Sequence, residues 1–261
     1  MNSESIPSHP ISDAGKSAEL VYRAYAALAD TFPFDADFGL GGKLLYAGEI
    51  GGQSRDLLLA ANIAGAASLA ASADPAAQRE AIRDGVVDFS VTSLEEALRI
   101  LKNEIRKRQP VSVAVAADPQ RLVGQMLDRG VLPDILPSAV DDGMARFVAQ
   151  GARQISDSAV DMGEFVPESG FGFVSWSVDR EFNRWMPTLD ACARGVIPAE
   201  DHLRRRWLRL APRYLGRGAQ RLHGVALSAE EAALFRAAAE EMMREESESV
   251  VRIEIRVGLF G

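Results

Sequence analysis

Residues 41–74 read GGKLLYAGEIGGQSRDLLLAANIAGAASLAASAD, and this stretch decides the fold. Its apolar run at 44–47 lies between glycines, as in a strand that is buried on both faces of a sheet. A glycine-rich turn at 48–54 follows, residues 55–64 have the apolar spacing of a helix, and a second apolar run occupies 67–71. We therefore predict a strand, a glycine turn, a helix and a strand, which together open a nucleotide-binding α/β fold.

The glycine turn is a candidate phosphate site, because backbone N–H groups at the start of a helix can hold a pyrophosphate. Its glycines, Gly48, Gly51 and Gly52, depart from the usual G-x-G-x-x-G register. Glycines also serve tight turns that bind nothing. The turn alone therefore leaves two interpretations open, a dinucleotide site and a structural turn without a ligand.

Strands and helices continue to alternate up to residue 136. Further strands are predicted at 86–91, 111–116 and 134–136, with helices between them. Asp74-Pro75 and Asp118-Pro119 each place a capping aspartate before a proline at the first helical position. This alternation indicates an α/β fold class, a Rossmann-like parallel sheet of about five strands with helices on both faces.

The remaining segments are assigned to a lead and an extension. We expect a disordered lead at 1–16, a Rossmann-like domain at 17–158 that begins with an amphipathic helix, and a mainly helical C-terminal extension at 159–261 packed on it. The elements expected beyond residue 137 are a helix at 141–153, a strand or aromatic loop at 170–178, an arginine-rich helix at 199–215, an alanine-rich helix at 228–246 and a terminal edge strand at 250–257.

Composition limits the classes of function. The 261-residue chain has a formal net charge of -8, which argues against general nucleic-acid binding because that needs a basic surface. No apolar run reaches the roughly 18 residues of a membrane span, and the N-terminus lacks the basic start and apolar segment of a signal peptide. The single cysteine, Cys192, allows no internal disulfide and suits a reducing compartment. We expect a cytoplasmic protein that binds neither nucleic acid nor membrane.

Several stretches of the chain, taken together, resemble the central NAD-binding domain of urocanase (urocanate hydratase). They are Tyr22-Arg23-Ala24-Tyr25-Ala26-Ala27-Leu28-Ala29, Gly42-Lys43-Leu44, Gly51-Gly52, residues 60–66, Leu69-Ala70, Asp74-Pro75, residues 94–98 and residues 129–134. The resemblance covers about residues 21–136 and implies a Rossmann-like fold with NAD as the cofactor. In urocanase, NAD acts as an electrophile that activates an imidazole ring for hydration.

The resemblance also implies which residues contact the cofactor. The pyrophosphate would lie on Gly51, Gly52, Gln53 and Ser54, where Gly52 leaves room for the ligand and Ser54 offers a hydroxyl. Ser72 occupies the position of the acid that binds the ribose, and Asp118 stands where the family has an Asn-Ala pair, although capping of a helix also explains Asp118. The missing acid keeps NADP open as an alternative, with Arg79 or Arg83 as partners of its phosphate.

The chain departs from urocanase after residue 136. A Gln-Thr-Ser-Ala-His segment is expected there, and Pro137-Ser138-Ala139-Val140-Asp141 stands instead, while the surroundings of Cys192 do not match the urocanase cysteine. We assign no catalytic residue. The preferred hypothesis is a protein that binds a dinucleotide or a small anionic ligand and lacks urocanate hydratase activity by itself. We expect it to be a homo-oligomer, preferably a homodimer.

Two alternatives stay open. One is a lyase (hydratase) acting on a small anionic or imidazole-type substrate with groups from the extension or a partner, which would have a closed polar pocket near Ser54 facing that extension. The other is an oligomeric interaction module that has lost its nucleotide, in which side chains would fill the pyrophosphate place.

Three further groups of residues were considered as sites. His9, His202 and His223 have no spacing typical of a metal site, so none is predicted. The arginines around His202 either gather an anion or form a solvated helix face. The aromatic side chains between 165 and 185 form core, the wall of a pocket or a dimer seam. They are Phe165, Phe171, Phe173, Trp176, Phe182 and Trp185.

Overall fold

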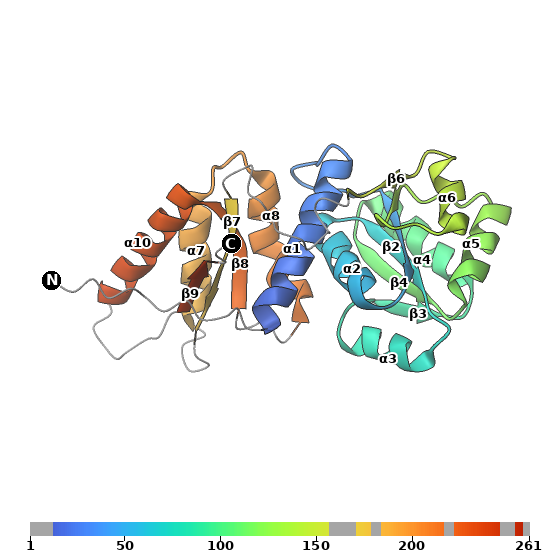
Figure 1. Cartoon of the computed structure of the whole chain (residues 1–261), viewed down its shortest axis with the longest axis horizontal. Coiled ribbons are helices and arrows are strands. Elements are labelled where there is room, and N and C mark those ends of the chain that lie inside the picture. Colours follow the sequence, from blue (N-terminus) through green and yellow to red (C-terminus); the bar gives the residue numbers. More distant parts are fainter. Residues whose placement is uncertain (1–12, 157–170, 179–183, 217–221, 246–253, 258–261) are drawn as a thin grey trace.

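The computed structural model describes residues 13–156, 171–178, 184–216, 222–245 and 254–257 (Figure 1). Its larger sheet is parallel and has six strands. The strands are β1 (Leu44–Glu49), β2 (Ala67–Ala71), β3 (Phe89–Val91), β4 (Val111–Val115), β5 (Ile135–Leu136) and β6 (Arg153–Gln154). The helices between them are α2 (Gly52–Ala64), α3 (Pro75–Arg83), α4 (Leu94–Lys107), α5 (Pro119–Asp128) and α6 (Asp142–Val148).

The order of the strands in this sheet is β3-β4-β2-β1-β5-β6. From β1 the chain moves to β2 and outward to β3, and after β4 it crosses back over the sheet to reach β5 on the other side of β1. The strand order therefore reverses between β1 and β5. In open α/β sheets, ligands bind beyond the carboxyl ends of the strands at such a reversal.

Both faces of this sheet are buried under apolar clusters. Successive side chains of a strand point to opposite faces, so each strand contributes to both clusters. Leu45 and Ala70 belong to one apolar cluster with α1 (Asp13–Thr31) and α2, whereas Tyr46 and Leu69 belong to a second cluster with α4 and α5. Two apolar cores, one on each face, explain why β1, β2 and β4 read as almost continuous apolar runs.

A second sheet lies in the C-terminal part of the chain. It is antiparallel, has the order β8-β7-β9, and consists of β7 (Phe171–Ser177), β8 (Leu222–Ser228) and β9 (Glu254–Val257). Helices α7 (Met186–Val196) and α10 (Ala229–Glu245) pack against each other beside it. Figure 1 shows α1 and α8 (His202–Tyr214) between the two sheets, and both of these helices contact α2 and β8. The extension therefore packs on the α/β part through α1 and α8.

Arginines of α8 hold this junction together, and two of them are buried. Arg206 donates from Nε to the Ile63 carbonyl at 2.8 Å and from Nη1 to the Asp37 carbonyl at 2.9 Å. Gly39 and Gly65 leave it room, because a Cβ at Gly65 would lie 2.8 Å from Nη2 of Arg206. Since Ile63 is in the last turn of α2, Arg206 caps a helix end whose carbonyls have no partner within the helix.

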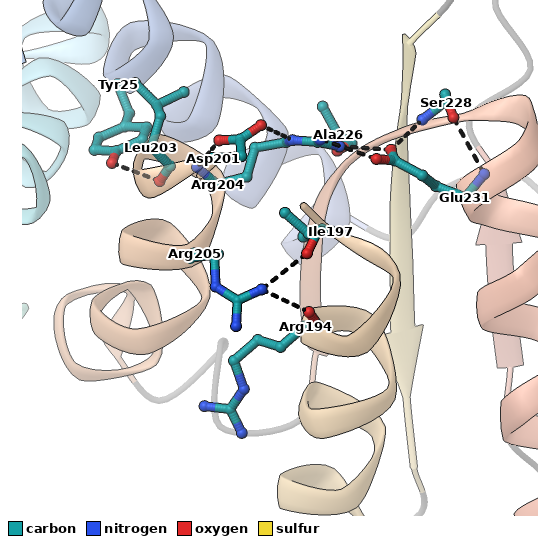
Figure 2. A network of polar contacts seen from close by, with 10 residues as sticks. All are labelled: Tyr25, Arg194, Ile197, Asp201, Leu203, Arg204, Arg205, Ala226, Ser228 and Glu231. Atoms are coloured by element: carbon teal, nitrogen blue, oxygen red, sulfur yellow. Dashed lines mark hydrogen bonds and ion pairs between the residues drawn. The ribbon is translucent and has the colours of Figure 1, made fainter. Parts of the chain in front are cut away.

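Arg204 is the second buried arginine and links α8 to α10 (Figure 2). Its guanidinium makes a two-pronged ion pair with Glu231 at 2.6 and 2.9 Å and a further bond to Asp201 at 2.6 Å. Figure 2 also shows Arg205 donating to the carbonyls of Arg194 and Ile197. Burial disfavours the charged guanidinium of Arg204, but the bonds to Glu231 and Asp201 outweigh burial and raise its pKa.

These contacts show what the buried arginines of the run do. Arg204 and Arg206 are each 6% exposed, so the solvated-face interpretation is wrong for them. Their donors are directed at Glu231, Asp201 and backbone carbonyls. Arg209, on the same helix, is exposed.

The described side chains of the aromatic segment belong to the core, as one of the interpretations predicted. Phe173, Trp176 and Trp185 are buried. Phe165 and Phe182 lie outside the described residues, and the side chain of Phe171 is not described.

Several element boundaries differ from the prediction. Helix α2 begins at Gly52 rather than at Arg55, strand β3 occupies only the last three of residues 86–91, and the helix predicted at 141–153 ends at Val148. That helix is shorter because the chain turns at Gly151, which has a φ of +103°, into the sixth strand β6. Helix α7 and strand β8 were not predicted, since β8 contains glycine and alanine, which favour strands poorly.

Candidate functional site

A cleft of about 560 Å³ lies at the carboxyl ends of β1 and β5, where the strand order reverses. This volume is in the range of small-molecule sites. The lining comes from α1, the end of β1, the first turns of α2, the segment after β5, α6 and Ile155. The side chains and backbone used below are those of Arg23, Gly48, Glu49, Gly52, Gln53, Ser54 and Asp56.

The start of α2 is open toward solvent. Gly51, the residue before the helix, has an extended backbone with φ −179°, and Gly52 has φ +21°. A Cβ built on either glycine meets no atom within 4 Å. Because the first N–H groups of a helix have no acceptor within the helix, the amides of Gly52, Gln53 and Ser54 offer donors at this opening. A phosphate group therefore fits this place, which no described side chain fills.

Strand β1 delivers the chain into this turn through an irregularity. The register of β1 against β2 shifts between Tyr46 and Glu49, and Gly48 at the shift has φ +77°. A side chain at Gly48 would therefore be strained, because that backbone conformation favours glycine. The three glycines of the turn thus have separate roles, a bend at Gly48 and open space at Gly51 and Gly52.

The hydroxyl of Ser54 is engaged locally. It accepts from the Gly51 amide at 2.9 Å and contacts the carbonyls of Glu49 and Gly51 at 2.6 and 2.7 Å. It therefore fastens the turn to the helix start, as in a capping box. The contact with a ligand that the resemblance implies for this residue is better supplied by its backbone amide than by its hydroxyl.

Ser72 and Asp118 lie at neighbouring strand ends and are absent from the described lining of the cleft. Ser72 is buried, and its hydroxyl accepts from the Asp74 amide at 3.2 Å. Asp118 caps α5 by accepting from the Arg121 amide at 3.0 Å. The fold thus brings Gly51 to Ser54 together at one site and places the other two residues beside it, and ligand contact by all six stays a prediction.

Asp56 is a residue of the cleft that the sequence did not single out. It lies one turn into α2 and is partly buried, and its carboxyl group makes no hydrogen bond or ion pair with the described residues. Burial raises the pKa of its carboxyl group to about 6, against a smaller opposing effect of Arg55. The available signal was a charged residue next to Arg55 at the start of the mainly apolar stretch 55–64, but a helix face toward solvent gives the same signal.

The other charged groups among the described residues of the cleft are Glu49 and Arg23. Glu49 ends β1 and is exposed, whereas Arg23 reaches the cleft from α1 and forms an ion pair with Glu19 one turn earlier in that helix. Arg55 is turned away from the cleft, since its guanidinium pairs with Asp84 at 2.6 Å. The part of the lining that the structure describes therefore carries two carboxylates and one arginine that is already paired.

The remaining candidates lie outside the cleft. The described residues contain no group of three metal-binding side chains. Cys192 is in α7, and burial raises the pKa of its thiol, which disfavours the reactive thiolate. His223 and Trp176 both contact Oδ1 of Asp190, at 2.8 and 3.1 Å, within the C-terminal layer. Among the helices described, none is long and apolar enough to cross a membrane.

Comparison with protein-family models gives a match between residues 22–142 and the urocanase Rossmann-like domain. The matched part runs from α1 to the start of α6 and includes the glycine turn and most of the cleft. It agrees with the stretch of about 21–136 on which the sequence resemblance rested, and the fold agrees as well. Residues 22–142 of this chain therefore match the Rossmann-like domain of the urocanase family, as the sequence resemblance predicted.

Proposed function

We propose that the chain binds a nicotinamide dinucleotide, with its pyrophosphate at the start of α2, and lacks urocanate hydratase activity by itself. The observation that carries this proposal is the open helix start at Gly51 and Gly52, located where the strand order of the sheet reverses. The urocanase relationship of residues 22–142 supports NAD as the dinucleotide, because that domain binds NAD in the family. When bound, NAD would supply an electrophilic nicotinamide ring.

The described lining of the cleft comes from the α/β part of the chain. An enzyme that used the C-terminal extension would bring groups of that extension to the cleft, but none of the described lining residues lies beyond Ile155. An interaction module that had lost its nucleotide would fill the pyrophosphate place with side chains, whereas that place is open among the described residues. A homo-oligomer and a cytoplasmic location stay predictions.

Gly51→Val tests the proposal by filling the opening. The extended backbone of Gly51 accepts any residue, so the variant should fold normally while its side chain covers the N–H groups of α2. We expect calorimetric titration with NAD to show micromolar binding to the wild-type protein and at least about tenfold weaker binding to the variant, a loss of about 1.4 kcal/mol.

Gly195→Val is the matched control. Gly195 is exposed near the end of α7, and a Cβ there also meets no atom within 4 Å. This control should bind NAD as the wild type does. Equal affinity of the Gly51 variant and the wild-type protein would contradict a ligand at the start of α2, and titration with NADP shows whether the phosphorylated dinucleotide is preferred.

A further inference from the structure

The position of the cleft indicates which half of a dinucleotide it would hold. In Rossmann folds the adenosine ribose lies at the end of the second strand, and the ligand crosses the point where the strand order reverses. Here Ser72 follows β2, whereas the cleft extends from β1 toward β5 and the segment Pro137, Ser138 and Ala139 behind it. On the proposed function, the nicotinamide half therefore lies in the cleft.

Two carboxylates border this half of the site. Asp56 on α2 faces the cleft without a hydrogen-bond or ion-pair partner among the described residues, and Glu49 lies at the end of β1. Arg55 is paired with Asp84, and Arg23 is paired with Glu19. A partly buried carboxylate without a counter-charge is unfavourable, and a cation brought next to it relieves that cost.

We propose that Asp56 selects the oxidised nicotinamide ring, which is cationic, over the reduced ring, which is neutral. This inference rests on the proposed function. The two ligands carry the same pyrophosphate and the same adenosine, so their difference in affinity reports mainly on the charge of the ring. A carboxylate within a few ångströms of that ring attracts the cation in a partly desolvated cleft and gains nothing from the neutral form.

The protonation of Asp56 gives the selectivity a pH dependence. Because burial raises the pKa of this carboxyl group to about 6, it is mostly ionised above that value and mostly neutral below it. Among the described residues, the charged groups that line the cleft with it are Arg23 and Glu49, and Arg55 is its neighbour on α2. The preference for the cationic ring should therefore be largest near neutral pH and decline on acidification.

The test compares NAD⁺ and NADH on the intact chain by calorimetry, with NADH fluorescence as a second readout. For the wild-type protein at about pH 7.5 we expect about tenfold tighter binding of NAD⁺, and a clearly smaller preference at about pH 5.5. Asp56→Asn, which keeps the shape and removes the charge, should bind both forms with nearly equal affinity at both pH values. Asp128→Asn, in an exposed position at the end of α5, is the matched control and should keep the preference.

The outcomes separate this inference from the proposed function. Binding of both forms with equal affinity by the wild-type protein would overturn the selectivity while leaving dinucleotide binding intact. A preference that persists in a folded Asp56→Asn variant would also overturn the role of Asp56. Binding of neither form would overturn the proposed function and this inference together.

Discussion

Replacement of Arg206, which links the C-terminal layer to the α/β part, should decrease the free energy of unfolding more than replacement of an exposed residue of α8. Its guanidinium is 6% exposed and donates to two carbonyls, those of Ile63 and Asp37. In Arg206→Met the apolar part of the side chain is retained, but both carbonyls lose their donor. Hydrogen bonds from charged groups contribute about 1.5 to 3 kcal/mol each, so the two lost bonds amount to about 3 to 6 kcal/mol.

Removal of the charge offsets part of that loss. Burial lowers the pKa of Arg206, with a smaller opposing effect of Tyr25, which means that its charged form is costly in this position. No carboxylate pairs with it among the described residues. We therefore expect Arg206→Met to decrease the free energy of unfolding by about 2 to 4 kcal/mol, which is less than the value of the two lost bonds alone.

Urea denaturation followed by circular dichroism measures this effect. Arg209→Met, an exposed position on the same helix, is the matched control and should change the free energy of unfolding by less than about 0.5 kcal/mol. If the Arg206 and Arg209 variants lost the same stability, the account of Arg206 as the cap of α2 would be refuted. Arg206→Lys should lie in between, because an ammonium group lacks the fork that reaches both carbonyls.

Two further predictions follow from groups whose pKa burial shifts. The raised pKa of Asp56, about 6, means that the folded protein binds a proton more readily than the unfolded chain, so this contribution to stability is full in acid and is lost as the pH rises through about 6. The pKa shift corresponds to at most about 3 kcal/mol of unfolding free energy, and to about 1 kcal/mol after solvent screening. In thermal melts at about pH 7.5, Asp56→Asn should therefore be more stable than the wild type by about 1 kcal/mol. A stability difference that stays constant across pH would contradict this. Cys192 should react with a disulfide reagent at least about tenfold more slowly in the folded protein than in denaturant, because burial raises its pKa, and equal rates would show an accessible thiol.

The parallel sheet could be predicted because its signals are local. The apolar runs of β1, β2 and β4 are bounded by glycines and prolines, and the Asp-Pro pairs before α3 and α5 mark helix starts that the structure confirms with capping bonds from Asp74 and Asp118. The predicted start of α2 is three residues too late, because Gly51 before the helix and Gly52 at its first position have low helix propensity. The local bonds of the Ser54 hydroxyl to the Gly51 amide and the Glu49 carbonyl hold that turn.

The C-terminal layer and the charges of the cleft could not be predicted in the same way. Arg204 and Arg206 look like solvated charges in the sequence, and only the fold shows that Glu231 and the end of α2 lie within reach. Asp56 likewise acquires its character from burial against residues far away in the chain. Long-range contacts of this kind leave no periodic signal, because their partners are distant in sequence.

The most direct test of dinucleotide binding is mass spectrometry of any small molecule released when the purified protein is denatured, followed by calorimetric titration of the stripped protein with NAD. We predict that NAD is released, or that the stripped protein binds it with micromolar affinity at one site per chain. Absence of both would contradict the proposed function, and the urocanase-type domain at residues 22–142 would then describe ancestry and fold alone.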